Sequence, residues 1–457
     1  MRLLVICALL LSGCLRPLGR ELALHTMPIT SEGRLATKQV PVPREPAEPR
    51  MAGYGPERAH AAWIAKTFRE SGKHTLLLYL HGGLVSLRSS AEESEKLKPR
   101  MEQDGYFPVF VNWDTGFMKS YGGHLVRKPN GYPGKGAAPL LAPFRLVLDV
   151  LEGVAMIPRS WGAAGINAVQ SNFLWHRKRD PILLADAQPC DGSYKLLCHD
   201  EGTPTRANMF GRSLQWIVQS PVKWVSTPIV YSGGGAAWND MLRRTRIIFE
   251  RDTEFFRSHP IRASEPEGAL SLLLQELVDR CDESEPLKLM IVAHSMGTIV
   301  ANAVLKRYLK NPRVQVEKIV YLGAAANISD SMESVVPYLQ AHPSARFFNV
   351  MLHPLAEDRE RSGWGFAPDG SLLAWVDGMY EHPHSFLERT FGRWSNVKPA
   401  LHLFPDDVRA QMHFHVLGFG NTPEKHGQLN DTHWLFWRDE FLLGEPDRAT
   451  TEDPIKN

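Results

Sequence analysis

The chain has 457 residues, of which 43% are hydrophobic and 22% charged, so it can bury a large core and is neither disordered nor fibrous. Lys and Arg number 52 against 50 Asp and Glu, which leaves a formal net charge of +2 and argues against nucleic acid as a partner. The length admits one large domain with insertions as readily as three small ones.

The N-terminus has the pattern of an export signal. Arg2 precedes an apolar run, residues 3–11, that is too short to span a bilayer. The segment Leu11-Ser12-Gly13-Cys14 follows directly and resembles the lipobox of bacterial lipoproteins. The resemblance implies that residues 1–13 are removed and that Cys14 is acylated, which would anchor the protein to a membrane. A plain signal cleavage, with Cys14 incidental, is the alternative.

The residue after Cys14 is Leu15 and not Asp, and this favours the outer over the inner bacterial membrane. Residues 14–60 are rich in Pro, Arg and Glu and suit a tether that can add a strand to the folded domain, residues 61–457. In an exported protein, Cys190 and Cys198 are expected to form a disulfide. Zinc binding by these two cysteines with His199 is disfavoured, because no second ligand pair has metal-site spacing.

Strand-like and helix-like segments alternate along most of the chain. Charged or amphipathic helix-like stretches separate six apolar, β-prone runs at residues 74–80, 106–113, 287–293, 316–322, 346–352 and 411–417. The helices are expected at residues 88–104, 238–256, 267–282, 297–310 and 434–443. This alternation without hairpin turns predicts an α/β fold with a mostly parallel sheet flanked by helices.

Ser295 is the candidate nucleophile. It lies in Ala293-His294-Ser295-Met296-Gly297, where an apolar strand gives way to an apolar helix, and the small residues on either side permit a tight, strained turn. Ser295 acting only as a helix cap is the alternative. A serine nucleophile also needs donors for the oxyanion, and we assign these to the backbone N–H groups of Gly83, in His81-Gly82-Gly83, and of Met296. An ordinary turn after the strand is the alternative for the two glycines.

This order of strand, His-Gly-Gly, strand and serine turn resembles the α/β-hydrolase superfamily of esterases and lipases, over about residues 74–116 and 238–443. The resemblance implies an acid after a later strand and a histidine after the last one. Asp358 is the expected acid, with Glu357 adjacent. His426 is favoured as the base because it lies in a loop beside a glycine, and His433, at the start of a predicted helix, stays open.

Two long segments interrupt this alternation of strands and helices. They are residues 117–237, here called the first excursion, and residues 359–409, the second excursion. The first contains a very apolar helical stretch, residues 141–172, which is expected to pack as a cap over the serine, the alternative being a position on a membrane surface. The second carries aromatic residues, among them Tyr380, Phe391 and Trp394, that are expected to supply either an aromatic wall or the core of the insert itself.

These features predict a membrane-anchored serine hydrolase with a Ser-His-Asp triad that cleaves carboxylic esters, with an acyl or lipid-like group under the first excursion. The chemistry requires neither a metal nor an organic cofactor. A serine peptidase or amidase, or a catalytically silent binding lipoprotein on the same fold, are the alternatives.

Overall fold

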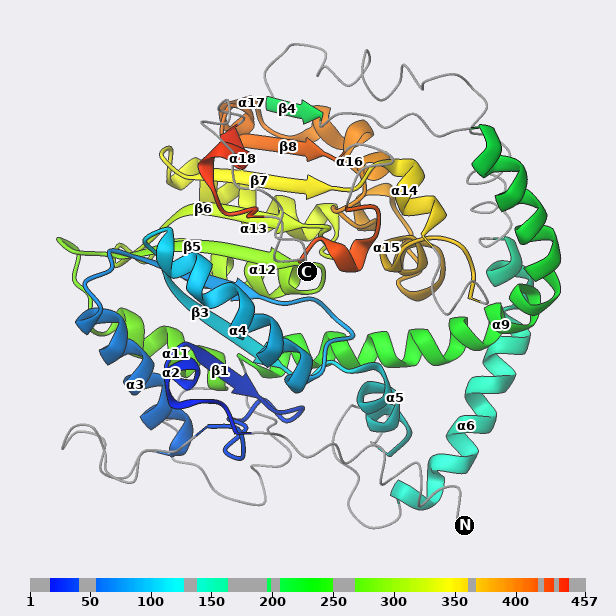
Figure 1. Ribbon diagram of the computed structural model, residues 1–457, viewed down its shortest axis with the longest axis horizontal. Helices are drawn as coiled ribbons and strands as arrows, with labels where there is room; N and C mark the ends of the chain where they lie inside the picture. The colour runs from blue at the N-terminus through cyan, green and yellow to red at the C-terminus, as the bar shows by residue number, and fades with distance from the viewer. Residues whose placement is uncertain are drawn as a thin grey trace.

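The computed structural model describes residues 17–40, 55–126, 138–162, 195–198, 206–249, 268–360, 367–417, 423–430 and 435–443. Its centre is an eight-stranded sheet in the order β1-β3-β2-β5-β6-β7-β8-β4. Every pairing between neighbouring strands is parallel. Figure 1 shows the sheet with helices on both sides, so the expected α/β architecture is confirmed.

All six predicted strands are present. They are β2 (Thr75–Leu80), β3 (Phe107–Trp113), β5 (Leu287–His294), β6 (Val314–Leu322), β7 (Arg346–Met351) and β8 (Met412–Val416). Their side chains alternate between two hydrophobic cores, one on each face. Leu76, Leu78 and Leu80 face one core, whereas Leu77 and Tyr79 face the other. Burial on both faces explains why these runs are continuously apolar.

Helices cover both faces of the sheet. The core that contains Leu76 is covered by α3 (Pro56–Glu70), α11 (Ala269–Val278), α12 (Gly297–Tyr308), α13 (Ile328–Ala341) and α16 (Trp394–Ala400). The other core is covered by α4 (Leu87–Gln103) and by the C-terminal segment with Phe436, Trp437 and α18 (Asp439–Leu443). Phe391 and Trp394 of the second excursion belong to the first core, so these two aromatic residues are structural.

Both edge strands come from segments in which the sequence does not predict a strand of the alternating pattern. β1 (Thr26–Ile29) belongs to the predicted tether and pairs with β3, so this segment docks on the domain as a strand. A short helix, α2 (Arg20–Ala23), precedes it. β4 (Lys195–Cys198) belongs to the first excursion and pairs with β8 at the opposite edge. Both strands have only four residues, too few to give a periodic signal.

The first excursion is mainly helical. It contains α5 (Phe117–Val126) and α6 (Ala138–Ala155), and it leads into α9 (Arg206–Ile247), which has 42 residues and begins far before the helix expected at 238–256. In Figure 1, α6 and α9 extend to one side of the molecule, and the last part of α9 runs along the sheet. No helix in the described ranges is both long and apolar enough to cross a membrane.

The second excursion packs against α9. It follows α14 (Pro354–Arg359) and contains short elements: α15 (Leu372–Trp375), η4 (Val376–Tyr380), η5 (Phe386–Glu388), α16, η6 (Leu401–Leu403) and α17 (Asp406–Arg409). Lys223 of α9 forms a buried ion pair with Asp369, at 2.7 Å. The Tyr231 hydroxyl lies 2.8 Å from Nε2 of His382.

Candidate active site at the carboxyl edge of the sheet

The predicted site residues collect where the central strands end. His81-Gly82-Gly83 follows β2, Ser295 follows β5, Gly323 follows β6, and His426 lies in η7 (His426–Gln428) after β8. Carboxyl ends of parallel strands meet at one edge of a sheet, which is where ligands bind in open α/β sheets. Strand order alone therefore brings these residues together.

Ser295 occupies a strained turn between β5 and α12. Its φ angle is +50°, in the left-handed region that costs a residue with a Cβ atom energy. Neighbouring backbone holds the turn: the N–H of Ser295 donates to Leu322 O at 2.8 Å, and Ser295 O accepts from the N–H of Ala325 at 3.1 Å. The strain predicted from the sequence is present, whereas a simple helix cap would not require it.

Glycines allow the turn to press against the end of β2. A Cβ atom on Gly297 would lie 2.3 Å from Leu80 O, and one on Gly82 would lie 2.8 Å from Nδ1 of His294 and 3.1 Å from Cβ of Ser295. At Gly83 the nearest atom would be Sδ of Met296, at 3.5 Å, an ordinary contact. Packing therefore requires the absence of a side chain at Gly82, whereas at Gly83 a methyl group would make only ordinary contacts.

His81 fixes the peptide between the two glycines. Its ring stacks on Trp113 with a centroid separation of 4.0 Å, and its Nε2 accepts the N–H of Trp113 at 3.0 Å. The proton is therefore on Nδ1, which donates to Gly82 O at 2.6 Å. Burial lowers the pKa of His81 to about 4, so the ring is neutral near pH 7.

The two N–H groups assigned to the oxyanion come from adjacent backbone. A Cβ atom on Gly83 would lie 3.5 Å from Sδ and 3.6 Å from Cβ of Met296, and Met296 is the N-cap residue of α12. Within the described ranges neither N–H donates to a backbone carbonyl. The N-terminus of a helix favours negative charge, which suits a group that would bind a developing oxyanion.

His426 lies beside the serine turn. A Cβ atom on Gly323 would lie 2.9 Å from the His426 ring. The centroid of that ring is 5.2 Å from the ring centroid of His294, the residue before Ser295. Burial, and secondarily the nearby His294, hold the pKa of His426 well below its ordinary value. Among the described residues, neither ring nitrogen of His426 nor Oγ of Ser295 has a hydrogen-bond partner, although all three atoms are buried.

The predicted acids bind other partners. Asp358 forms an ion pair with Arg393 at 3.0 Å, and Arg393 also contacts Asp377 at 3.1 Å. The carboxylate of Glu357 is buried and accepts a hydrogen bond from Ser371. In sequence nothing indicates that Arg393, 35 residues away, would pair with Asp358. Neither acid has a hydrogen bond to His426 in the part of the chain described here.

Glu360 is the acid in contact with the residue proposed as the base. Its Oε2 accepts the backbone N–H of His426 at 2.8 Å. Burial raises the pKa of Glu360, and this hydrogen bond opposes the rise. The sequence argument overlooked Glu360, although it belongs to the same acidic segment, Glu357-Asp358-Arg359-Glu360, that yielded the other two candidates.

Several predicted sites lie outside the described residues: Cys14, Cys190 and His433. Cys198 ends β4, but the proposed disulfide with Cys190 is not described. These expectations stay as predictions.

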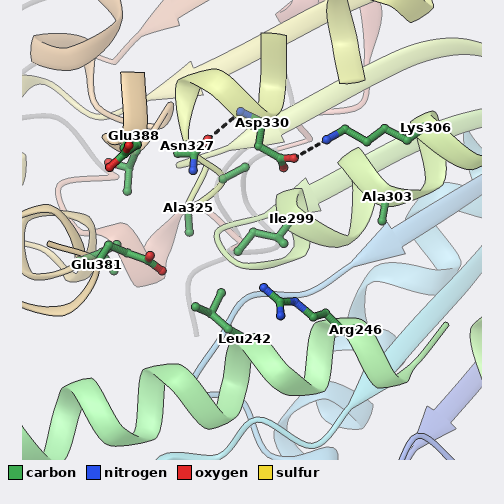
Figure 2. Close-up of a pocket in the computed structure, with 13 residues that line it drawn as sticks. Leu242, Arg246, Ile299, Ala303, Lys306, Ala325, Asn327, Asp330, Glu381 and Glu388 are labelled. Atoms are coloured by element: carbon green, nitrogen blue, oxygen red, sulfur yellow. Dashed lines mark hydrogen bonds and ion pairs between the residues drawn. The ribbon is translucent and has the colours of Figure 1, made fainter. Parts of the chain in front are cut away.

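A groove of about 400 Å³ borders the helix that begins at the serine turn. Figure 2 shows Arg246 and Leu242 of α9 facing Ile299 of α12 and Ala325, with the ion pair of Lys306 and Asp330 farther along α12. Ala325 connects the groove to the site, because its N–H binds Ser295 O. Ser295, His426 and Gly83 do not line this groove, so it adjoins the reacting groups without containing them.

An apolar cluster lies beside Met296. Its buried members come from α9, the N-cap of α12, the segment after β6 and the second excursion; they are Tyr231, Trp238, Met241, Met296, Ala325, Leu373, Val376, Met379 and Tyr380. A Cβ atom on Gly234 would lie within the Tyr380 ring, so this glycine allows α9 to approach the excursion. α9 thus packs next to the serine turn, and among the described residues of the stretch at 141–172, Met156 packs against the same cluster.

Comparisons of the chain with protein-family models, with curated proteins and with solved structures find no match.

Proposed function

We propose that this chain is a serine hydrolase that cleaves carboxylic esters, with Ser295 as the nucleophile. One observation carries the proposal: Ser295 is held at φ +50° between a buried strand and a helix, and its Oγ is buried without a partner among the described residues. The neutral imidazole of His426, equally without a partner there, lies with its ring centroid 5.2 Å from that of His294, the residue before Ser295. Buried polar atoms without partners in a folded protein need an explanation, and a site that is completed by its substrate provides one.

In the proposed reaction, Oγ of Ser295 attacks the carbonyl carbon while a nitrogen of His426 takes the hydroxyl proton. The oxyanion accepts hydrogen bonds from the N–H groups of Gly83 and Met296. The C–O bond then breaks, and the alcohol leaves with the proton held by His426. Water, deprotonated by His426, hydrolyses the acyl-enzyme in the same way and restores Ser295.

We propose Glu360 as the positioning acid in preference to Asp358. The carboxylate of Asp358 is engaged by Arg393, whereas Glu360 already holds the backbone of His426. Glu360→Gln is expected to lower kcat more than Asp358→Asn when the two variants fold equally well. A larger loss in Asp358→Asn would restore the acid predicted from the sequence.

The substrate is proposed to be an acyl ester. Met296 supplies one of the oxyanion donors and also belongs to the apolar cluster under α9, so an alkyl chain next to the reacting carbonyl would contact Trp238 and Met241 of the same cluster. We also propose that the protein is exported and anchored to a bacterial membrane, the outer one being favoured, through acylated Cys14. Incorporation of radiolabelled palmitate that disappears in Cys14→Ser tests the anchor.

A fluorophosphonate probe tests the nucleophile. The parent protein is expected to be labelled and to hydrolyse p-nitrophenyl esters, and Ser295→Ala is expected to do neither. Ser334→Ala, which removes a buried hydroxyl from α13, is the matched control and is expected to retain both activities. Absence of labelling in the parent would favour a silent binding protein. Loss of activity in His433→Ala, with retention in His426→Ala, would transfer the role of base to His433.

A further inference from the structure

Helix α6 is amphipathic, but its polar stripe faces the protein and its apolar side chains face the solvent, which is the reverse of a helix that packs on a core. Arg145, Asp149 and Gly153, spaced four residues apart, lie on one stripe and face the protein. The large apolar side chains lie on the remaining surface and are 47–69% exposed; they are Phe144, Leu146, Val147, Leu148, Val150, Leu151 and Val154. The cap expected from residues 141–172 would bury these side chains, whereas the structure leaves them exposed.

Polar bonds hold α6 in this orientation. Asp149 accepts a hydrogen bond from the Tyr121 hydroxyl at 2.9 Å and contacts Nε2 of His124 at 3.2 Å. Arg145 donates to the carbonyls of His124 and Leu125 at 2.9 and 3.1 Å. Turning the apolar face inward would break all four contacts. The exposed face is therefore a fixed property of the folded protein.

The adjoining part of α9 repeats the pattern. Lys223 and Thr227 are buried, whereas Val222, Trp224, Val225 and Ile229 are 40–69% exposed. The two helices touch closely, since a Cβ atom on Gly153 would lie 2.8 Å from Pro228 O. Trp161 lies edge to face with Trp224 at 4.8 Å and donates its indole N–H to Trp224 O at 2.9 Å.

We propose that the exposed apolar side chains of α6 and α9, here called the α6–α9 face, dock on the surface of a lipid bilayer. Monomeric soluble proteins rarely expose apolar patches of this extent without a function. Charge favours an anionic lipid surface over a second copy of the chain. In sequence, residues 127–137 directly precede α6 and contain Arg127, Lys128 and Lys135 and no acidic residue, whereas Glu152 is the one exposed acidic residue of α6. Tryptophan beside aliphatic side chains is typical of helices that lie in the membrane interface.

This contact is separate from the proposed acylation of Cys14 and does not depend on the chemistry of Ser295. It would hold the protein on the bilayer through a second point, at the first excursion. A protein that lacks the acyl chain should therefore still bind vesicles.

The test uses the chain from residue 14 onward with Cys14→Ser, so that neither an acyl chain nor the apolar signal can bind lipid. Flotation with vesicles of phosphatidylglycerol and phosphatidylethanolamine measures binding. The double variant Val147→Glu/Leu151→Glu is expected to bind vesicles at least about tenfold more weakly than the parent, because it places two charges on the α6–α9 face. Leu403→Glu/Leu443→Glu alters two side chains of 42% exposure elsewhere and is expected to bind like the parent.

Arg127→Gln/Lys128→Gln/Lys135→Gln is expected to weaken binding to anionic vesicles more than binding to phosphatidylcholine. Thermal unfolding of each variant shows whether it is folded. We expect all of them to be folded, because the substituted apolar side chains are exposed. The proposal is overturned if the parent does not float with vesicles, or if Val147→Glu/Leu151→Glu floats equally well. A second outcome also overturns it: light scattering shows that the parent is a dimer and that Val147→Glu/Leu151→Glu is a monomer, and the parent does not bind vesicles. A second copy of the chain would then cover the α6–α9 face.

Discussion

Nδ1 of His81 donates a hydrogen bond to the carbonyl oxygen of Gly82 at 2.6 Å. Because a trans peptide directs its C=O and N–H to opposite sides, this bond also directs the N–H of Gly83 away from His81. Thr115 Oγ1 approaches the same carbonyl at 3.4 Å. His81 is thus a positioning residue for the proposed oxyanion donor, without touching the substrate itself.

Replacing His81 should separate this role from packing. In His81→Asn the side-chain amide can take the place of Nδ1, whereas His81→Gln can replace Nε2 only. We expect His81→Gln to lose about 10- to 100-fold in kcat with KM little changed, and His81→Asn to lose less. Equal losses in kcat, or losses confined to KM, would contradict the positioning role. Esterase kinetics give kcat and KM for both variants, and thermal unfolding shows that each variant is folded.

The two glycines after His81 should respond differently to alanine. Gly82→Ala would press its methyl group against His294 and Ser295, and we expect it to be destabilised by about 1–3 kcal/mol and to lose probe labelling. Gly83→Ala makes only ordinary contacts and should fold like the parent. Urea unfolding decides, and similar stabilities of the two variants would count against the close approach at Gly82.

The backbone strain at Ser295 should be measurable without any substrate. Glycine relieves the left-handed strain, at a small cost from the greater freedom of the unfolded chain. Ser295→Gly is therefore expected to be more stable than Ser295→Ala by about 0.5–1 kcal/mol in urea unfolding. If the alanine variant proved as stable as the glycine variant, the turn would not be strained in solution.

Glu357 should make stability depend on pH. Burial raises its pKa from 4.5 to about 8, so the folded state holds a proton that the unfolded state releases between these values. The resulting stabilisation is complete below pH 4.5 and is lost as the pH rises through about 8. Glu357→Gln removes this dependence, and its stability relative to the parent should rise by up to about 4 kcal/mol between about pH 5 and about pH 9.

Thermal or urea unfolding at the two pH values measures this change. Glu92→Gln makes the same substitution at a side chain that is 59% exposed and serves as the matched control for the effect of the substitution itself. A pH-independent difference between Glu357→Gln and the parent would mean that Glu357 ionises normally in the folded protein.

The acid side of the activity profile should reflect His426. A base must be neutral to accept the proton from Ser295, and burial holds the pKa of His426 well below 6.5. We expect kcat/KM to stay constant as the pH falls from 7 to about 6 and to decline only in more acidic buffer. A half-maximal value near pH 6.5 or above would indicate a base that is not buried and would argue against His426.

The sequence predicted the interior of the sheet well and its periphery poorly. The six central strands are apolar on both faces, so their signal does not depend on neighbours. The edge strand β4 and the extended α9 do depend on neighbours, since β4 pairs with β8 alone among the described strands and Gly234 of α9 lies against Tyr380. Hydropathy showed that α6 is apolar but not which way it faces, because Tyr121 and His124 set its orientation.

The same distinction applies to the site. The strained turn at Ser295 could be predicted because the short-range geometry of a tight turn restricts which residues can occupy it. Asp358 was chosen by its position after a strand, and its pairing with Arg393 is a tertiary contact that no local pattern reveals. Glu360 could have been considered from its place in the same acidic segment.

The buried ion pair between Lys223 and Asp369 determines how separable the two excursions are. Trp238 donates to Glu381 and Tyr231 contacts His382 across the same boundary. Excising residues 117–237 would remove Lys223 and leave the nearly inaccessible carboxylate of Asp369 without its lysine, which is costly in a protein interior. The excursions are therefore not a detachable module, and shortening the protein to a minimal catalytic core would require redesigning both together.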